Sequence, residues 1–99
     1  MTAEEEQRRK ATAAQSRANQ ADDLLNNPLY IEAVTVMRAA MYGEFEDSKL
    51  ADDDTRHELW QRMQLMKAFQ GHFEKIVKEG KKGAQTIKML DDRDNNPSV

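Results

Sequence analysis

Apolar residues recur at helical spacing in two stretches of this chain, one after Pro28 and one after Thr55. In both stretches the apolar positions fall three, four and seven residues apart. This spacing places the apolar side chains on one face of an α-helix. The first stretch consists of Leu29, Tyr30, Ala33, Val34, Met37, Ala40, Met41 and Phe45. The second consists of Leu59, Met63, Met66, Phe69 or Gln70, Phe73, Ile76 and Val77.

The first of these helices has a clear start signal. Asn27 is a favourable N-cap residue, and Pro28 is favourable at the first helical position. We therefore expect a helix to begin at Pro28, and Gly43 weakens its far end.

The second helix also has local signals at both ends. Thr55 and Glu58 have the spacing of a capping box, and the aspartates at 52–54 suit the positive end of a helix dipole. Gly80 has the residue type typical of a C-cap. These signals predict a helix over residues 56–79 that begins after Thr55 and ends at Gly80.

The remaining segments are expected to contribute little to a core. Residues 1–22 have high helix propensity but no large apolar residue after Met1, which predicts a flexible arm or a nascent helix. Residues 84–90 form a short candidate helix, and residues 91–99 read as a disordered tail. The predicted fold is all-α, an antiparallel helical hairpin within residues 23–90, flanked by the arm and the tail.

Composition limits the core and the classes of site. The chain has 99 residues, of which 33% are charged and 38% hydrophobic, enough for a thin core that self-association would complete. The absence of cysteine excludes disulfides and thiolate metal sites, and it fits a reducing cytoplasm. No stretch is apolar for long enough to span a membrane, so no membrane partner is expected.

No arrangement of residues predicts catalysis. His57 and His72 lie about 22 Å apart along one helix, too far to share a metal ion. The glycines at 80 and 83 are not followed by the Lys-Ser/Thr pair of a phosphate-binding loop. We therefore expect a protein that is not an enzyme and that uses no cofactor or metal.

Basic residues concentrate near the end of the second helix, and Glu79 is the only acid between Lys75 and Lys88. Such a cluster can contact nucleic-acid phosphates without reading sequence, since no aromatic residue is available there for base stacking. The alternative is a solvated helix end that complements the helix dipole. The candidate nucleic-acid-binding residues are Lys75, Lys78, Lys81, Lys82 and Lys88, with Arg8, Arg9 and Lys10 as a second group.

Apolar residues on the second helix occupy more than one side, and a two-helix hairpin cannot cover them all. Methionines add an adaptable surface suited to contacts between helices. Part of this surface is therefore expected to meet another copy of the chain, which makes a homo-oligomer the expected state. The candidate interface residues are Trp60, Met63, Met66, Phe69, Phe73, Met37 and Met41.

A set of short segments resembles small helical proteins of tailed bacteriophages and prophages. The segments are Arg17-Ala18, Leu24-Leu25-Asn26-Asn27-Pro28-Leu29, Glu32-Ala33, Asp54-Thr55-Arg56-His57-Glu58-Leu59-Trp60, Gly80 and Ala84. Within that group, the architecture resembles the oligomerisation core of a small terminase subunit, a family that builds rings and presents viral DNA to a large packaging motor subunit. Many members carry an N-terminal helix-turn-helix domain, which residues 1–27 are too short to form.

The resemblance implies an oligomeric phage assembly protein in the host bacterial cytoplasm that binds DNA non-specifically and docks onto a large motor subunit. A different hypothesis is a small phage protein that modulates another phage or host protein, with the acidic segment 44–54 as its contact. A third is a structural component of the virion.

Overall fold

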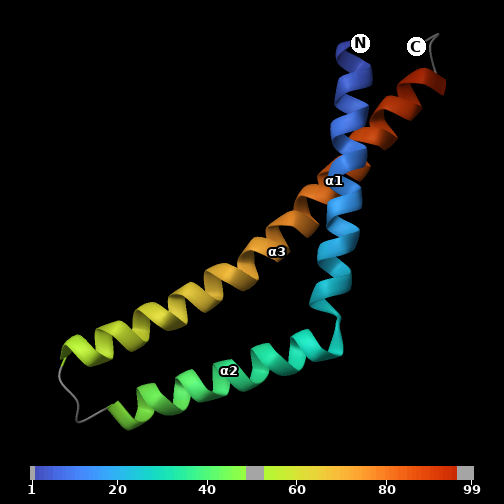
Figure 1. The fold of residues 1–99 in the computed structure, drawn as a ribbon. Helices are drawn as coiled ribbons and strands as arrows, with labels where there is room; N and C mark the ends of the chain where they lie inside the picture. Colours follow the sequence, from blue (N-terminus) through green and yellow to red (C-terminus); the bar gives the residue numbers. More distant parts are fainter. Residues whose placement is uncertain (1, 49–52, 96–99) are drawn as a thin grey trace. The chain divides into compact units, whose positions relative to one another are not determined.

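The chain is all-helical in its computed structural model, which describes residues 2–48 and 53–95 (Figure 1). The described residues form three helices: α1 (Ala3–Leu25), α2 (Pro28–Asp47) and α3 (Asp53–Asn95). The predicted all-α class is therefore confirmed. Asp52, whose charge was predicted to suit the helix N-terminus, and residues 96–99 of the predicted tail lie outside the described residues.

The start of α2 confirms the capping prediction. The Asn27 side-chain oxygen accepts hydrogen bonds from the backbone N–H groups of Leu29 at 2.9 Å and Tyr30 at 3.2 Å. Pro28 occupies the first turn, where its missing N–H has no helical partner to lose. At the other end, the Ser48 hydroxyl donates to the Phe45 carbonyl at 2.6 Å, so α2 ends in a satisfied cap.

Helix α3 differs from its prediction at both ends. It begins at Asp53, so Thr55 lies inside the first turn and is not the N-cap. It also continues through Gly80 and Gly83 to Asn95. The predicted C-cap at Gly80, the separate helix over 84–90 and the disordered residues from 91 to 95 are therefore wrong. Both glycines keep ordinary helical backbone, since no glycine among the described residues has a positive φ.

The described chain divides into two compact units. Unit 1 comprises Met1–Asp23 and Phe73–Val99, and unit 2 comprises Leu24–His72. Unit 1 thus joins α1 to the second half of α3, and unit 2 joins α2 to the first half of α3.

Close helix contact explains the glycines of unit 1. A Cβ on Gly80 would lie 2.1 Å from the Ala18 Cβ, and a Cβ on Gly83 would lie 2.7 Å from the Ala11 carbonyl oxygen. Real Cβ atoms do not approach other atoms so closely, so only glycine permits this spacing of the two helices. Tertiary packing has therefore overridden the local preference of glycine to end a helix.

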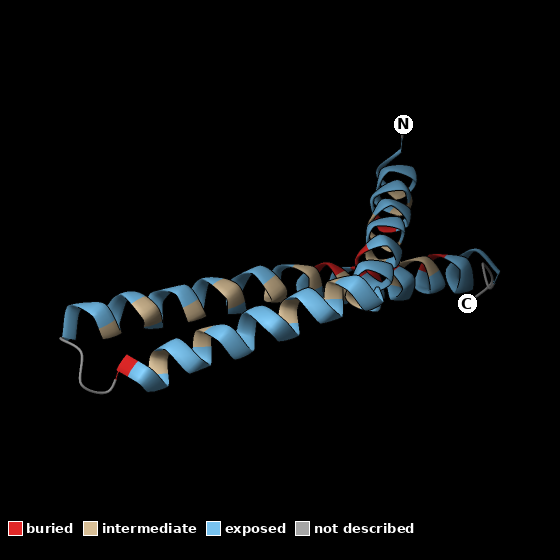
Figure 2. Ribbon diagram, turned by 60° about the horizontal axis from the view of Figure 1, so that its bottom comes forward, coloured by how far each residue is buried: buried red, intermediate tan, exposed pale blue. Residues whose placement is uncertain are grey.

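The buried apolar residues of the described ranges all lie in unit 1, and the buried residue at the end of α2 is the polar Ser48 (Figure 2). Among the apolar residues of unit 1, Ala11, Ala21, Ile76 and Leu90 are buried, and Leu90 is only 1% exposed. The expectation that nothing in residues 1–22 could anchor them to a core is wrong. Alanine, not a larger apolar residue, provides the anchor, because it lets α1 lie directly against the glycines of α3.

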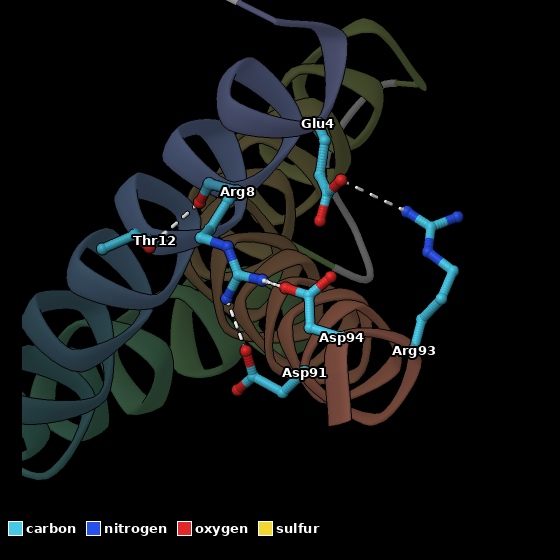
Figure 3. A network of polar contacts seen from close by, with 6 residues as sticks. All are labelled: Glu4, Arg8, Thr12, Asp91, Arg93 and Asp94. Atoms are coloured by element: carbon cyan, nitrogen blue, oxygen red, sulfur yellow. Dashed lines mark hydrogen bonds and ion pairs between the residues drawn. The ribbon is translucent and has the colours of Figure 1, made fainter. Parts of the chain in front are cut away.

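Ion pairs connect the beginning of α1 with the end of α3 (Figure 3). Arg8 donates to Asp91 at 2.6 Å and to Asp94 at 3.2 Å, and Arg93 lies 3.9 Å from Glu4. The hydrogen bond to Asp91, helped by the nearby charges of Asp91, Asp94 and Glu4, raises the pKa of the Arg8 guanidinium above its ordinary value. These contacts pair low-numbered residues of α1 with high-numbered residues of α3, which fixes an antiparallel arrangement inside unit 1.

Contacts inside unit 2 also run in opposite order along its two helices. Arg38 of α2 donates to Gln70 of α3. Further along α2, Glu44 lies 4.0 Å from Arg62, and the Arg56 guanidinium lies 5.0 Å from the centre of the Phe45 ring. This order is consistent with the antiparallel hairpin that the sequence predicts.

Unit 2 differs from unit 1 in its burial. None of the α2 residues from 28 to 47 is buried, and in the described part of α3 that belongs to unit 2 no side chain is buried either. The two helices pair through half-buried residues such as Val34, Met41, Met63 and Met66. Unit 2 therefore has a thin seam between two helices and no enclosed core among its described residues.

Candidate interaction surfaces

An apolar groove lies along one side of the helix pair of unit 2. Its volume is about 540 Å³. Almost all of its lining surface is apolar, and Arg62 is its single charged residue. We call the following residues the apolar groove: Tyr30, Ala33, Val34, Met37, Met41, Arg62, Leu65, Met66 and Phe69.

The walls of the apolar groove include large side chains that remain in contact with solvent. Leu65 is 70% exposed and Phe69 is 55% exposed. These side chains remain exposed because α2 and α3 each pack only one face against the other helix. An apolar wall of this extent on a small helical unit is typical of an interaction surface.

Helix α2 is the more unusual of the two walls. Between Pro28 and Gly43 its only charged residues are Glu32 and Arg38, and apolar side chains surround the helix. A helix that is apolar all round is normally buried on several sides. In this structure only one side of α2 meets α3, so its remaining apolar sides are uncovered.

A second groove lies on the other side of the helix pair, with a volume of about 400 Å³. Its lining mixes Met41, Met63 and Met66 with polar groups such as Gln64 and Lys67. The two sides of unit 2 therefore have different chemistry, and the lining of the apolar groove is almost entirely apolar.

The structure brings together only part of the predicted interface. Met37, Met41, Met66 and Phe69 all line the apolar groove. Met63 lies in the mixed groove instead. These positions remain a prediction of an interface, since no partner chain is present.

Two predicted interface aromatics lie elsewhere. Trp60 is exposed and stacks on His57, with ring centroids 5.8 Å apart and an interplanar angle of 16°. Phe73 is half-buried at the first position of the second segment of unit 1. Neither residue lines the apolar groove.

The predicted interface omitted several groove residues, among them Leu65, which is 70% exposed. Leu65 falls between two positions of the predicted stripe on α3 and was not assigned to it. An available signal was its spacing of four from Phe69, which marks a second apolar line beside the first.

The predicted basic residues of α3 are exposed but are not all equivalent. Lys75, Lys78, Lys81, Lys82 and Lys88 are all exposed. Lys78 and Lys82 lie on the face of α3 opposite Gly80, as their helical spacing requires. Lys81 lines a shallow groove that also contains Asp22, which offsets part of its charge.

The basic residues of α1 are engaged within unit 1. Arg8 is held by Asp91 and Asp94. Arg9 and Lys10 both lie within ion-pair distance of Glu6, at 3.9 Å and 3.7 Å. Of the two predicted basic groups, the α3 lysines are the better placed to meet phosphate groups.

Residues 2–48 and 53–95 contain no cluster of three or more side chains suited to hold a metal ion. Across the same ranges, no helix combines the length and hydropathy needed to cross a lipid bilayer. Comparison with known proteins gives no match to a family model, to a curated protein or to a solved structure.

Proposed function

We propose that this chain is an oligomeric assembly protein of the small-terminase type. Its copies associate through the apolar groove of unit 2, an antiparallel helical hairpin. Its α3 lysines contact nucleic-acid backbone, and the oligomer presents viral DNA to a large motor subunit in the host bacterial cytoplasm.

One observation carries the self-association. No apolar side chain in the described part of unit 2 is buried, whereas nine large ones are exposed: Leu24, Leu29, Ile31, Val36, Met37, Tyr42, Trp60, Leu65 and Phe69. Three of these exposed side chains, Met37, Leu65 and Phe69, line the apolar groove. A second copy supplies an apolar surface of the same kind.

The lysines support the nucleic-acid part of the proposal. They are exposed on α3, and no ion pair within the described ranges involves Lys75, Lys78 or Lys82. Each lysine that neutralises a phosphate releases counterions, so the affinity for DNA should fall as salt concentration rises. Such contacts would not distinguish one sequence from another.

Native mass spectrometry of the full chain tests the self-association. The wild type is expected to form a closed ring of about eight or more copies. Leu65→Lys should break the ring into smaller species, because a charge in the apolar groove cannot be desolvated cheaply. Met89→Lys is the matched control, since Met89 is an exposed apolar residue of unit 1, and it should leave the oligomer intact. A monomeric wild type would overturn the proposal and favour the modulator hypothesis.

Fluorescence anisotropy with two duplexes of unrelated sequence tests the DNA contact. Replacing Lys78, Lys81 and Lys82 by Ala should weaken binding equally for both duplexes and reduce the salt slope by about three. Unchanged binding would remove these lysines from the proposed function.

A further inference from the structure

A second uncovered surface of unit 2 lies on α2, next to the apolar groove. We call it the outer α2 face and define it by Leu29, Ala33, Val36, Ala40 and Gly43. The steps between these positions are four, three, four and three residues, so they form one continuous strip along the helix. The strip contains no charged residue.

The large side chains of the outer α2 face are among the most exposed large apolar side chains of the described residues. Leu29 is 73% exposed and Val36 is 62% exposed. Ala33, Ala40 and Gly43 are also exposed. Ala33 belongs to the apolar groove as well, so one neighbouring copy could border both surfaces.

No contact among the described residues requires glycine at position 43. Gly43 lies inside α2, where glycine is less favourable than alanine, and a Cβ added to it would meet nothing within 4 Å. Gly80 and Gly83 show the contrasting case, since each is required by a helix packed directly on it. A helix from outside the chain would give Gly43 the same role.

The sequence of the outer α2 face is complementary to itself in one orientation. Leu29 and Gly43 each lie seven residues from Val36, on opposite sides of it. If a second α2 packs antiparallel with the two Val36 residues facing each other, each Leu29 meets Gly43 of the other copy. The largest side chain of the strip then lies over the position that has none, at both ends of the contact.

The charges beside the strip favour the same orientation. In the antiparallel register Glu32 falls opposite Ala40 of the other copy. A parallel pairing would place Glu32 opposite Glu32, where the like charges repel. It would also place Leu29 opposite Leu29, which crowds one end of the contact, and Gly43 opposite Gly43, which leaves a gap at the other end. The complementarity therefore favours a second copy of this chain, related by a two-fold axis, as the occupant.

We propose that α2 pairs antiparallel with α2 of a second copy across a two-fold axis at Val36, with Leu29 of each copy packed on Gly43 of the other. The contact rests on the proposed function, because it is one of the interfaces of the assembly. It adds a register and a symmetry that the apolar groove alone does not define.

Disulfide cross-linking of the full chain tests the register directly, because the natural chain contains no cysteine. Val36→Cys should form a covalent dimer on mild oxidation, since a two-fold axis brings the two copies of this position within the range a disulfide spans. An equal mixture of Leu29→Cys and Gly43→Cys should cross-link, whereas Leu29→Cys alone should not. Gly71→Cys is the control, because Gly71 is also a helical glycine with nothing within 4 Å.

A size-exchange variant provides a second test. Gly43→Leu should reduce the abundance of the full wild-type assembly at least tenfold in native mass spectrometry, and adding Leu29→Ala should restore most of it. Gly71→Leu should have no such effect. Cross-linking of Leu29→Cys alone would overturn the antiparallel register. An oligomeric wild type in which Val36→Cys stays uncross-linked would overturn the α2 contact and leave the proposed function standing, whereas a monomeric wild type would overturn both.

Discussion

The Ala18 Cβ occupies the space in which a side chain on Gly80 would have to begin. A Cβ built on Gly80 falls 2.1 Å from the Ala18 Cβ and 3.2 Å from the Ala14 carbonyl oxygen. Helices α1 and α3 therefore approach each other backbone to backbone at this level. The contact explains how a segment without large apolar residues becomes part of a packed unit.

Gly80→Ala should destabilise unit 1 by about 1–3 kcal/mol, because a methyl group there must push α1 away. Chemical unfolding followed by circular dichroism measures this change. Gly71→Ala is the matched control, and it should be neutral or stabilise the chain by up to about 1 kcal/mol, since its added methyl group meets nothing within 4 Å.

Exchanging the two small residues should recover part of the loss. The double variant Gly80→Ala with Ala18→Gly removes the closest clash and keeps the number of methyl groups constant. Equal stability of Gly80→Ala and Gly71→Ala would instead show that the close contact between α1 and α3 does not form.

Leu90 should be the most sensitive large apolar residue, because it is only 1% exposed. Leu90→Ala is expected to cost about 2–5 kcal/mol in the free energy of unfolding. Phe73 is half-buried, so Phe73→Ala should cost less than the roughly 3–5 kcal/mol typical of a fully enclosed ring. Urea denaturation measures the loss of unfolding free energy for both variants. A larger loss for Phe73→Ala than for Leu90→Ala would show that Leu90 is not the centre of the core of unit 1.

Arg8→Glu should lower the melting temperature more than Arg9→Glu does. Arg8 bridges Asp91 and Asp94 across two helices, whereas Arg9 faces only Glu6 of its own helix. The difference between the variants should shrink as salt is added, because both sites are open to solvent. Thermal unfolding at low and high salt measures it, and equal melting temperatures at low salt would contradict the bridge.

The same bridge predicts how the Arg8 charge responds to pH. A raised pKa means that its stabilising effect is fully present below the ordinary arginine value and is lost only as pH rises through the higher value. The Arg8 charge should therefore contribute no change in stability between about pH 6 and 9. The melting-temperature difference between Arg8→Gln and the wild type should be constant over that range.

Local chemistry was enough to predict the start of α2. Asn27 and Pro28 act through atoms within three residues of themselves, so their roles can be read from sequence without the rest of the fold. The apolar stripe of α3 was similarly predictable, since Met63, Met66 and Ile76 all fall on its less exposed side.

The fate of Gly80 could not be predicted from its neighbours in sequence. A glycine that ends a helix and a glycine that admits another helix have the same local sequence preferences, and the difference lies in Ala14 and Ala18, more than sixty residues away. A signal was present in the alanines at 11, 14, 18 and 21, which repeat at helical spacing. A search for large apolar residues overlooks such a pattern, because alanine contributes little to a hydrophobic face.

The absence of buried side chains along α2 has a consequence for the thermodynamics of the chain. If copies of the chain cover these apolar sides, association and folding of unit 2 are linked by mass action. The midpoint for melting unit 2 would then rise with total protein concentration, as it does for obligate oligomers. Unit 1, with Leu90 and the glycine contacts enclosed inside one chain, would keep a midpoint independent of dilution, so dilution alone could separate the two transitions.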